Sequence, residues 1–347
     1  MGKTEEAHFI LSKSKLLKQY QIVSGLADRV AYSYKTNPLV GNLLEKLTDC
    51  NLSVHFVNSL KNIKDKKRVW FLGLALSKEA VDRLLSQGIR SFIIENKPDL
   101  DVLLERIEKR RRHIDLLLRM RMKEHTVKTE THYVYGMLSS DINVLIPELR
   151  KNKYIDKLGV HFHRKTENIG EWEIKEELEE MLSESTFDNI NIIDIGGGIP
   201  VAYKNYSGET LPYIFNKIKE ARKWANKRGI KLIVEPGRFI AAPCIELHTT
   251  ITAISGNTLF LNCSVYNSAM DTINYNIKLP VKGELASGNG KRYLLKGCTP
   301  DSLDIFRYSV YLKDAKIGNK IIFTNAGAYT YSTNFCDLEP LKTVIIK

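Results

Sequence analysis

The side chains that could do chemistry are concentrated in a few short stretches of the sequence. These hold a lysine, two histidines two residues apart, a triple glycine, and an acid and a base around a Pro-Gly turn: Lys35, His161 and His163, Gly196–Gly198, Glu235 and Arg238. Lysine amines attack carbonyl groups, N–H groups of glycine-rich turns approach anions closely, and arginine binds phosphate through paired hydrogen bonds. The set therefore offers a nucleophilic amine, an anion site, an acid and a base.

Each stretch by itself also has a purely structural interpretation. A lysine at a strand end is usually a solvated charge, three glycines can form a tight turn, and Glu235 could simply pair with Arg238. The two histidines could bind a metal ion, but the sequence shows no third ligand, so no metal is expected. The glycines also lack the GxGxxG spacing of a dinucleotide-binding turn.

The elements that must position these residues follow an alternating pattern. Short β-branched or apolar runs alternate with amphipathic, charged runs, which is typical of parallel βα units. Eight runs are predicted as strands, over residues 29–35, 53–58, 69–73, 91–96, 114–121, 157–163, 190–196 and 231–237. Helices are predicted between them, over residues 39–50, 77–88, 98–111, 141–153, 171–185 and 212–229. Eight such units predict a (β/α)8 TIM barrel over residues 21–240.

The pattern changes after the barrel. Strands separated by turn signals are predicted there, over residues 245–254, 258–265, 277–281, 292–295 and 320–324. The predicted fold class is therefore α/β, with the barrel followed by a β-rich C-terminal domain over residues 241–347. The N-terminal segment, residues 1–20, is expected to pack on this second domain.

A TIM barrel forms its active site at the carboxyl ends of its strands. The predicted strands place Lys35 after the first, His163 after the sixth, the triple glycine after the seventh and Glu235 after the eighth. The loops after the last two strands are the usual phosphate site of such barrels. Pyridoxal 5′-phosphate needs an amine for its aldehyde, N–H groups and an arginine for its phosphate, and an acid for its ring nitrogen. The sequence therefore predicts a pyridoxal-phosphate site.

Six motifs follow one another along nearly the whole chain: Tyr34–Asn37, His161–His163, Asp194–Gly198, Glu235–Arg238, Gly297–Asp304 and Asn325–Tyr329. In type and order they resemble the fold-type III pyridoxal-phosphate enzymes with an alanine-racemase-like barrel, specifically the ornithine and diaminopimelate decarboxylase group. The resemblance implies that Lys35 holds the cofactor as a Schiff base, that His163 stacks on its ring and that Glu235 binds the ring nitrogen. It also implies phosphate contacts from Thr166, Gly196, Gly197, Gly198, Gly237, Arg238 and Tyr329.

The same resemblance implies an amino-acid decarboxylase that acts as a homodimer, in which the second domain of one subunit supplies a loop to the barrel of the other. This loop departs from the group in one respect: where Gly-Pro-Thr-Cys-Asp is usual, Gly297–Asp301 has its proline and cysteine exchanged. Cys298 is therefore the candidate proton donor after carbon dioxide leaves. Cys263 occupies the position of a substrate-binding aspartate in ornithine-type enzymes, and Asp301 remains as the candidate partner for a distal substrate cation.

The resemblance leaves the substrate open among the ornithine, lysine, arginine and diaminopimelate class of basic or diamino acids, in polyamine or lysine metabolism. The His161–His163 motif also resembles the carboxynorspermidine decarboxylases. An amino-acid racemase on the same fold and a catalytically inactive regulatory homologue are further alternatives. A racemase would need a second acid–base residue opposite Lys35 and would release no carbon dioxide.

Composition limits the other partners. The 347 residues carry a formal net charge of +12, but Lys and Arg are spread through mixed-sign helices, so nucleic acid is not expected as a partner. The five cysteines lie far apart without a CxxC pair, which predicts neither a disulfide framework nor a zinc site. The sequence shows no apolar run of membrane or signal-peptide length, so no membrane partner is expected and the cytoplasm is the expected location.

Overall fold

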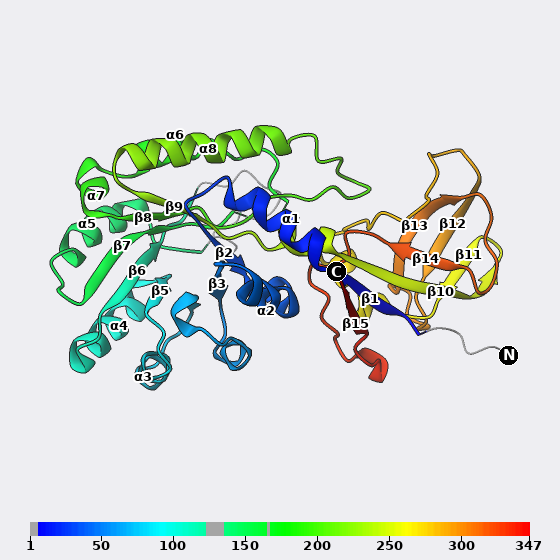
Figure 1. Ribbon diagram of the computed structural model, residues 1–347, viewed down its shortest axis with the longest axis horizontal. Helices are drawn as coiled ribbons and strands as arrows, with labels where there is room; N and C mark the ends of the chain where they lie inside the picture. Colours follow the sequence, from blue (N-terminus) through cyan, green and yellow to red (C-terminus); the bar gives the residue numbers. More distant parts are fainter. Residues whose placement is uncertain (1–5, 123–134, 165–166) are drawn as a thin grey trace. The chain divides into compact units, whose positions relative to one another are not determined.

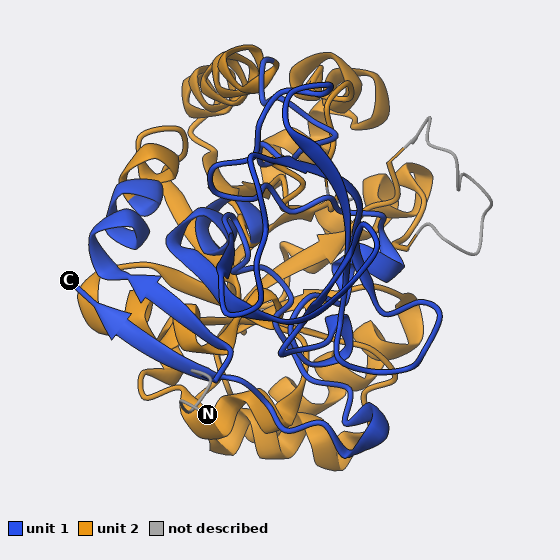
Figure 2. Cartoon of the chain, turned by 90° about the vertical axis from the view of Figure 1, so that its right-hand side faces the viewer, with its two compact units in different colours: residues 1–20, 201–209, 238–347 blue, residues 21–200, 210–237 orange. Residues whose placement is uncertain are grey.

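The computed structural model describes residues 6–122, 135–164 and 167–347, and the chain divides into two compact units (Figure 2). Unit 1 comprises residues 1–20, 201–209 and 238–347. Unit 2 comprises residues 21–200 and 210–237. Unit 1 is therefore assembled from three segments of the chain and unit 2 from two.

Unit 2 contains a closed barrel of eight parallel strands, which confirms the predicted TIM barrel (Figure 1). The strands are β2 (Arg29–Ser33), β3 (Asn51–Val54), β4 (Val69–Gly73), β5 (Ser91–Ile94), β6 (Ile114–Arg119), β7 (Ile155–His161), β8 (Ile192–Asp194) and β9 (Lys231–Val234). Each strand pairs with the next along the chain, and β9 pairs with β2, so the barrel has no free edge. Buried apolar residues from six of the strands pack in one cluster: Ala31, Trp70, Ile93, Leu117, Ile192 and Ile233.

The barrel strands alternate with seven helices in the described ranges. The helices are α2 (Pro38–Leu47), α3 (Lys78–Ser86), α4 (Lys97–Arg110), α5 (Ser139–Leu149), α6 (Ile174–Met181), α7 (Glu184–Asn189) and α8 (Leu211–Lys227). Of these, α2, α3, α4 and α7 begin at a capping side chain. The predicted helix over residues 171–185 is wrong in one respect, because it is divided into α6 and α7. Leu182 is extended, and the Ser183 hydroxyl accepts a hydrogen bond from the Thr186 N–H, which starts the second helix. None of the helices in the described ranges is both long and apolar enough to cross a membrane.

Unit 1 is built around a mostly antiparallel sheet, which confirms the predicted β-rich second part of the fold. Its strands are β1 (His8–Ser12), β10 (Ile245–Ser255), β11 (Thr258–Leu261), β12 (Lys291–Lys296), β13 (Ile305–Leu312), β14 (Lys320–Phe323) and β15 (Lys342–Ile346). They lie in the order β13-β12-β11-β10-β1-β15, with β14 also paired to β10. The short helices α9 (Arg238–Ala241) and α10 (Asp271–Asn274) also belong to this unit, and α1 (Lys13–Ser24) begins in it.

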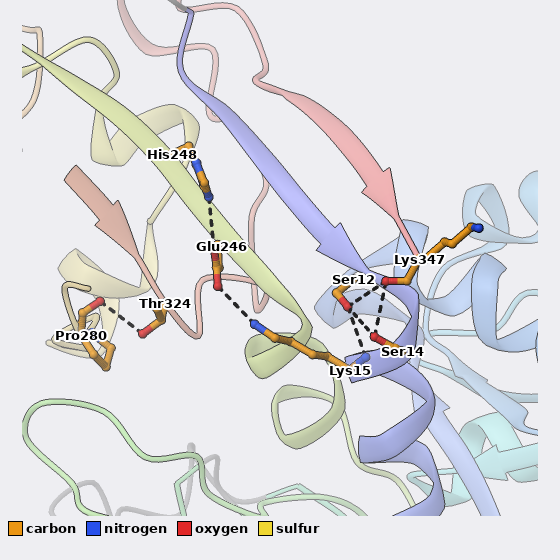
Figure 3. A network of polar contacts seen from close by, with 8 residues as sticks. All are labelled: Ser12, Ser14, Lys15, Glu246, His248, Pro280, Thr324 and Lys347. Atoms are coloured by element: carbon orange, nitrogen blue, oxygen red, sulfur yellow. Dashed lines mark hydrogen bonds and ion pairs between the residues drawn. The ribbon is translucent and has the colours of Figure 1, made fainter. Parts of the chain in front are cut away.

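The strand β1 lies in the interior of this sheet. β1 pairs antiparallel with β10 and parallel with β15. Polar side chains reinforce the pairing (Figure 3): Lys15 donates to Glu246 at 3.1 Å, and the Ser12 hydroxyl donates to the Lys347 carbonyl at 3.3 Å. The strand therefore joins segments from opposite ends of the sequence.

Three strands of unit 1 were not expected from the sequence, and one expected strand is wrong. The predicted strand over residues 277–281 contributes only an isolated bridge between Val281 and Phe323. The unexpected strands are β1, β13 and β15. β1 and β15 are short strands that pair with each other although they lie near opposite ends of the sequence. The local sequence pattern therefore does not predict them.

Candidate active site

The candidate residues of unit 2 meet at the carboxyl ends of the barrel strands. Lys35 lies in a short 3₁₀ helix (Tyr34–Thr36) directly after β2. His161 is the last residue of β7, and His163 follows two positions later. Glu235 directly follows β9, and its N–H donates to the Gly196 carbonyl at 2.6 Å. Residues that are far apart in the sequence are thereby gathered at one end of the barrel.

Glu235, the acid of this group, is buried, with 1% of its surface exposed. His161 Nε2 lies 3.3 Å from its Oε2 atom, and His163 Nδ1 lies 4.0 Å from the same oxygen. Burial alone would raise the pKa of Glu235, but the hydrogen bond from His161 and the electrostatic interactions with both imidazoles lower this pKa to about 2. Glu235 is therefore an ionised carboxylate at neutral pH.

His163 presents a neutral ring beside this carboxylate. The Gly197 N–H donates to His163 Nδ1 at 3.2 Å, so the neutral ring carries its proton on Nε2. Burial and then the charge of Lys35 hold the pKa of His163 well below its ordinary value. Its side chain is 28% exposed, so a neutral, planar face is accessible at the end of the barrel.

The two histidines and Glu235 correct one expectation from the sequence, because Glu235 is a third potential metal ligand. Their ligand atoms lie within 4.8 Å of one another. However, Nδ1 of His163 already accepts the Gly197 N–H, and Nε2 of His161 donates to Glu235. Hydrogen bonding within the protein thus accounts for the arrangement of this triad.

Lys35 is exposed at the carboxyl end of the barrel, but protein surrounds its amine closely enough to change its titration. Desolvation lowers the pKa of Lys35; the charge of Glu235 opposes this shift, and that of Arg119 adds to it. His55, which follows β3, responds to the same surroundings: burial, followed by the charge of Lys35, lowers its pKa to about 4. Lys35 therefore deprotonates more readily than an ordinary surface lysine.

Two residues at this end of the barrel were not singled out from the sequence. Arg119, the last residue of β6, forms an ion pair of 3.0 Å with Glu95, which directly follows β5. The charge of Arg119 contributes to the lowered pKa values of Lys35 and His163. Both residues lie near the carboxyl ends of predicted strands, over residues 91–96 and 114–121, which is where a barrel forms its active site. Their positions could therefore have been noticed in the sequence.

Asp194 lies within the Asp194–Gly198 motif, but no role in the site was predicted for it from the sequence. It is fully buried, and its Oδ1 atom accepts the Gly196 N–H at 2.9 Å. Desolvation, together with the charge of Glu235, raises the pKa of Asp194 well above its ordinary value. Burial and the nearby charge of Glu235 therefore both disfavour the ionised form of Asp194.

At the glycines around this site a side chain would collide with neighbouring atoms or require a strained backbone. Gly196 has φ = 65°, and a Cβ on it would lie 2.4 Å from the Phe162 carbonyl oxygen. A Cβ on Gly197 would lie 2.7 Å from the Glu235 carbonyl oxygen, and one on Gly237 would lie 2.1 Å from the Thr36 hydroxyl. Gly198 also has a positive φ, of 98°. These positions favour glycine, and we call the set Gly196, Gly197, Gly198 and Gly237 the glycine cradle. The Gly196 and Gly197 N–H groups donate to Asp194 and His163 within it. Thr166, the remaining phosphate candidate of the barrel, lies outside the described residues.

Arg238 and Tyr329, the other phosphate candidates, belong to unit 1. The Arg238 guanidinium lies 5.2 Å from the centre of the Tyr329 ring and donates to the Tyr203 hydroxyl at 3.1 Å. Tyr329 adopts φ = 55°, a left-handed conformation that is uncommon for an aromatic residue. Unit 1 therefore presents a buried guanidinium between two tyrosines.

The substrate candidates form a second group in unit 1. The Tyr266 hydroxyl donates to Asp301 Oδ1 at 2.9 Å, and the same oxygen accepts the Leu303 N–H at 2.8 Å. The Cys298 N–H donates to the Cys263 carbonyl at 3.0 Å, which ties the two cysteine segments together. Cys263 is fully buried and burial raises its thiol pKa, whereas Cys298 is exposed and its pKa is raised less strongly. Of the two thiols, only that of Cys298 is accessible.

A TIM barrel with a lysine, a neutral imidazole, a buried carboxylate and a glycine cradle at its carboxyl end defines a pyridoxal-phosphate type of site. A model of the pyridoxal-binding domain of pyridoxal-dependent decarboxylases matches residues 55–242. The chain therefore belongs to the pyridoxal-dependent decarboxylase family. The family and the cofactor predicted from the sequence are confirmed at this level.

Individual relatives agree with this assignment. A probable ornithine decarboxylase from Dictyostelium discoideum is 24% identical over 372 residues, covering 96% of this chain and 78% of the relative. The arginine decarboxylase of Paramecium bursaria Chlorella virus superposes with a TM-score of 0.81 at 18% identity, covering 99% of this chain and 96% of that one. The lysine/ornithine decarboxylase of Vibrio vulnificus, solved with cadaverine, gives 0.79 at 18% identity over 98% and 94% of the two chains. At these identities the structural likeness shows the fold.

The residues of this chain fit the cofactor that the family requires. The clearest indication is the glycine cradle, in which a Cβ on Gly196 or Gly197 would collide with backbone oxygens, because a glycine-only turn of this kind is typical of anion sites. Beside it stand an ionised acid that can face a protonated ring nitrogen, a neutral ring that can stack, and an amine of lowered pKa.

Proposed function

We propose that this chain is a pyridoxal-phosphate-dependent decarboxylase of a basic amino acid, with its cofactor bound at the carboxyl end of the barrel. The observation that carries the proposal is the buried, ionised Glu235 beside the neutral ring of His163. An ionised acid is what a protonated pyridine nitrogen needs as its partner. A stacking ring must be uncharged to lie against a positively charged heterocycle without repulsion.

Each barrel residue then has a defined task. Lys35 would hold the cofactor through its amine, and its lowered pKa enlarges the neutral, nucleophilic fraction near neutral pH. Glu235 would keep a proton on the ring nitrogen, while His163 would fix the plane of the ring. When bound, the cofactor supplies an electron-accepting ring that stabilises the negative charge left at the substrate α-carbon when carbon dioxide departs.

The phosphate is assigned to the glycines of the cradle, with Gly237, Thr166, Arg238 and Tyr329 as further contacts. Backbone N–H groups in a glycine turn favour an anion without losing side-chain freedom, and a guanidinium adds charge. Arg238 and Tyr329 already lie together in unit 1, which supports their acting as one phosphate-binding group.

A basic substrate is favoured by the surroundings of Asp301. Its Oδ1 atom is held by Tyr266 and by the Leu303 N–H, and within the described residues Oδ2 has no hydrogen-bond partner. A half-buried carboxylate that is fixed in position can bind a distal ammonium or guanidinium group. We further propose a homodimer in which Asp301 of one subunit binds the substrate held at the barrel of the other subunit.

The proton that replaces carbon dioxide is assigned to Cys298. Cys298 is exposed, and partial desolvation raises the pKa of its thiol above the ordinary value. The thiol is therefore uncharged at neutral pH and can donate a proton. Cys263 is buried, so it contributes to the substrate pocket as an apolar wall. A catalytically inactive homologue would bind the cofactor without releasing carbon dioxide.

The proposal is tested by release of carbon dioxide from a panel of amino acids. Purified protein supplied with pyridoxal phosphate is expected to show a visible cofactor band and to decarboxylate ornithine, lysine, arginine or diaminopimelate in preference to leucine and glutamate. Enantiomer formation without carbon dioxide would identify a racemase. A cofactor band with neither product would identify the inactive homologue.

Replacement of Asp301 by asparagine is expected to lower kcat/KM for the preferred basic substrate by about 10²-fold, because the distal cation loses its counter-charge. Cofactor absorbance should not change, since Asp301 is assigned to the substrate and not to the cofactor. Asp314→Asn, at an exposed carboxylate of the same unit, is the matched control. Equal kinetics of the D301N and wild-type proteins would remove Asp301 from the substrate site.

A further inference from the structure

Arg238 is enclosed by partners from its own unit. It is the first residue of α9 and is 4% exposed. Its guanidinium lies 5.8 Å from the Tyr203 ring and 5.2 Å from the Tyr329 ring, and its Nη2 atom lies 2.6 Å from Asp271 Oδ2. Asp271 begins α10, and its side chain is 8% exposed. A cation in this position is therefore neutralised by one buried carboxylate.

Within the protein, the charges of Arg238 and Asp271 neutralise each other. A second anion bound at Arg238 would lie close to the Asp271 carboxylate and be repelled by it. A buried guanidinium needs a counter-charge because desolvation of an unpaired ion is very unfavourable. Burial raises the pKa of Asp271, and the charge of Arg238 only partly offsets this effect. The charge of Arg238 therefore favours the ionised form of Asp271, and a phosphate dianion at the same guanidinium would repel this carboxylate.

We propose that Asp271 is an internal counter-ion that competes with phosphate for Arg238 and thereby limits the affinity of this chain for its cofactor. The inference rests on the proposed phosphate role of Arg238. In the absence of phosphate, Asp271 orients the guanidinium between the two tyrosines and prevents an unpaired buried charge. When phosphate binds, the dianion replaces Asp271 as the principal partner of Arg238.

The competition predicts a gain of affinity when the carboxylate is removed, whereas a purely structural role predicts a loss. Asp271→Asn keeps the shape of the side chain and removes its charge. We expect the Kd for pyridoxal phosphate, followed by absorbance, and the Kd for inorganic phosphate, followed by calorimetry, both to fall about tenfold. The same variant should melt at a lower temperature without phosphate and regain that difference when phosphate is added.

Controls separate this effect from a general change of charge. Glu284→Gln removes the carboxylate of another buried ion pair of unit 1, that with Arg307 at 2.9 Å, and should not tighten phosphate binding. In an Arg238→Gln background, Asp271→Asn should have no effect on either Kd, because the site of competition is gone. Asp271→Ser provides a second uncharged variant if D271N folds poorly.

The outcomes distinguish the inference from the function on which it rests. Equal or weaker binding of both probes by folded D271N or D271S protein, with normal cofactor absorbance in the wild type, would overturn the competition. Wild-type protein without any cofactor band would overturn the proposed function. In that case tighter binding of inorganic phosphate to D271N would still support Asp271 as the competitor for Arg238.

Discussion

Replacement of Lys35 by alanine is expected to abolish the visible band of bound cofactor and to lower carbon dioxide release at least about 10³-fold. The amine of Lys35 is the one to which the cofactor would be attached. Its lowered pKa, caused chiefly by desolvation, gives it more neutral nucleophile than an ordinary lysine at the same pH. The side chain of alanine leaves the cofactor with only non-covalent contacts.

The measurement combines absorbance with chemical trapping. Borohydride treatment of the wild-type protein followed by peptide mass spectrometry should place the cofactor on Lys35, and the K35A protein should carry none. Lys231→Ala is the matched control, because Lys231 is exposed and begins β9 at the opposite end of the same barrel. Cofactor trapped on another lysine of the wild-type protein would exclude Lys35 from this role.

Replacement of Glu235 by glutamine is expected to lower kcat by about 10²–10³-fold while the cofactor band persists. The loss follows from charge, because an amide cannot stabilise a proton on the ring nitrogen as a carboxylate does. The low pKa of Glu235, about 2, means that the acid is ionised throughout the range in which the assay is run. Its protonation occurs only as pH falls toward that value, so the wild-type activity profile above about pH 5 should show no step from Glu235.

The control for this variant is Asp28→Asn. Asp28 accepts the Leu232 N–H at 2.9 Å at the amino-terminal end of β9, so it is a carboxylate of the same barrel far from the candidate site. The D28N protein should retain its kcat. A folded E235Q protein with wild-type kcat would show that the ring nitrogen does not depend on this acid.

Much of the fold was predictable because local patterns of apolar and polar residues mark its strands and helices. Each barrel strand is a short apolar run between polar or glycine signals, and each prediction overlapped the observed strand. The predicted bounds of β4 were right, but in the other seven strands the predicted end ran past the real one, as in β8, which ends at Asp194 and not at Gly196. Residues after the strands belong to the site loops, whose conformation is set by tertiary contacts and not by periodicity. β1 and β15 were missed for a related reason, since each is stabilised by strands that are remote in sequence.

The sequence by itself determined which chemical groups stand at the ends of which strands, since strand order and glycine positions are local properties. It could not determine their charge states. Tertiary structure decided that Glu235 is ionised, that the pKa of Asp194 is raised and that His163 is neutral, because burial and the neighbours across the barrel control those equilibria. The partner of Arg238 was likewise invisible, since Asp271 reaches it only through the folding of unit 1. Lys35 was recognised from its position, but its lowered pKa follows chiefly from desolvation at the end of the closed barrel.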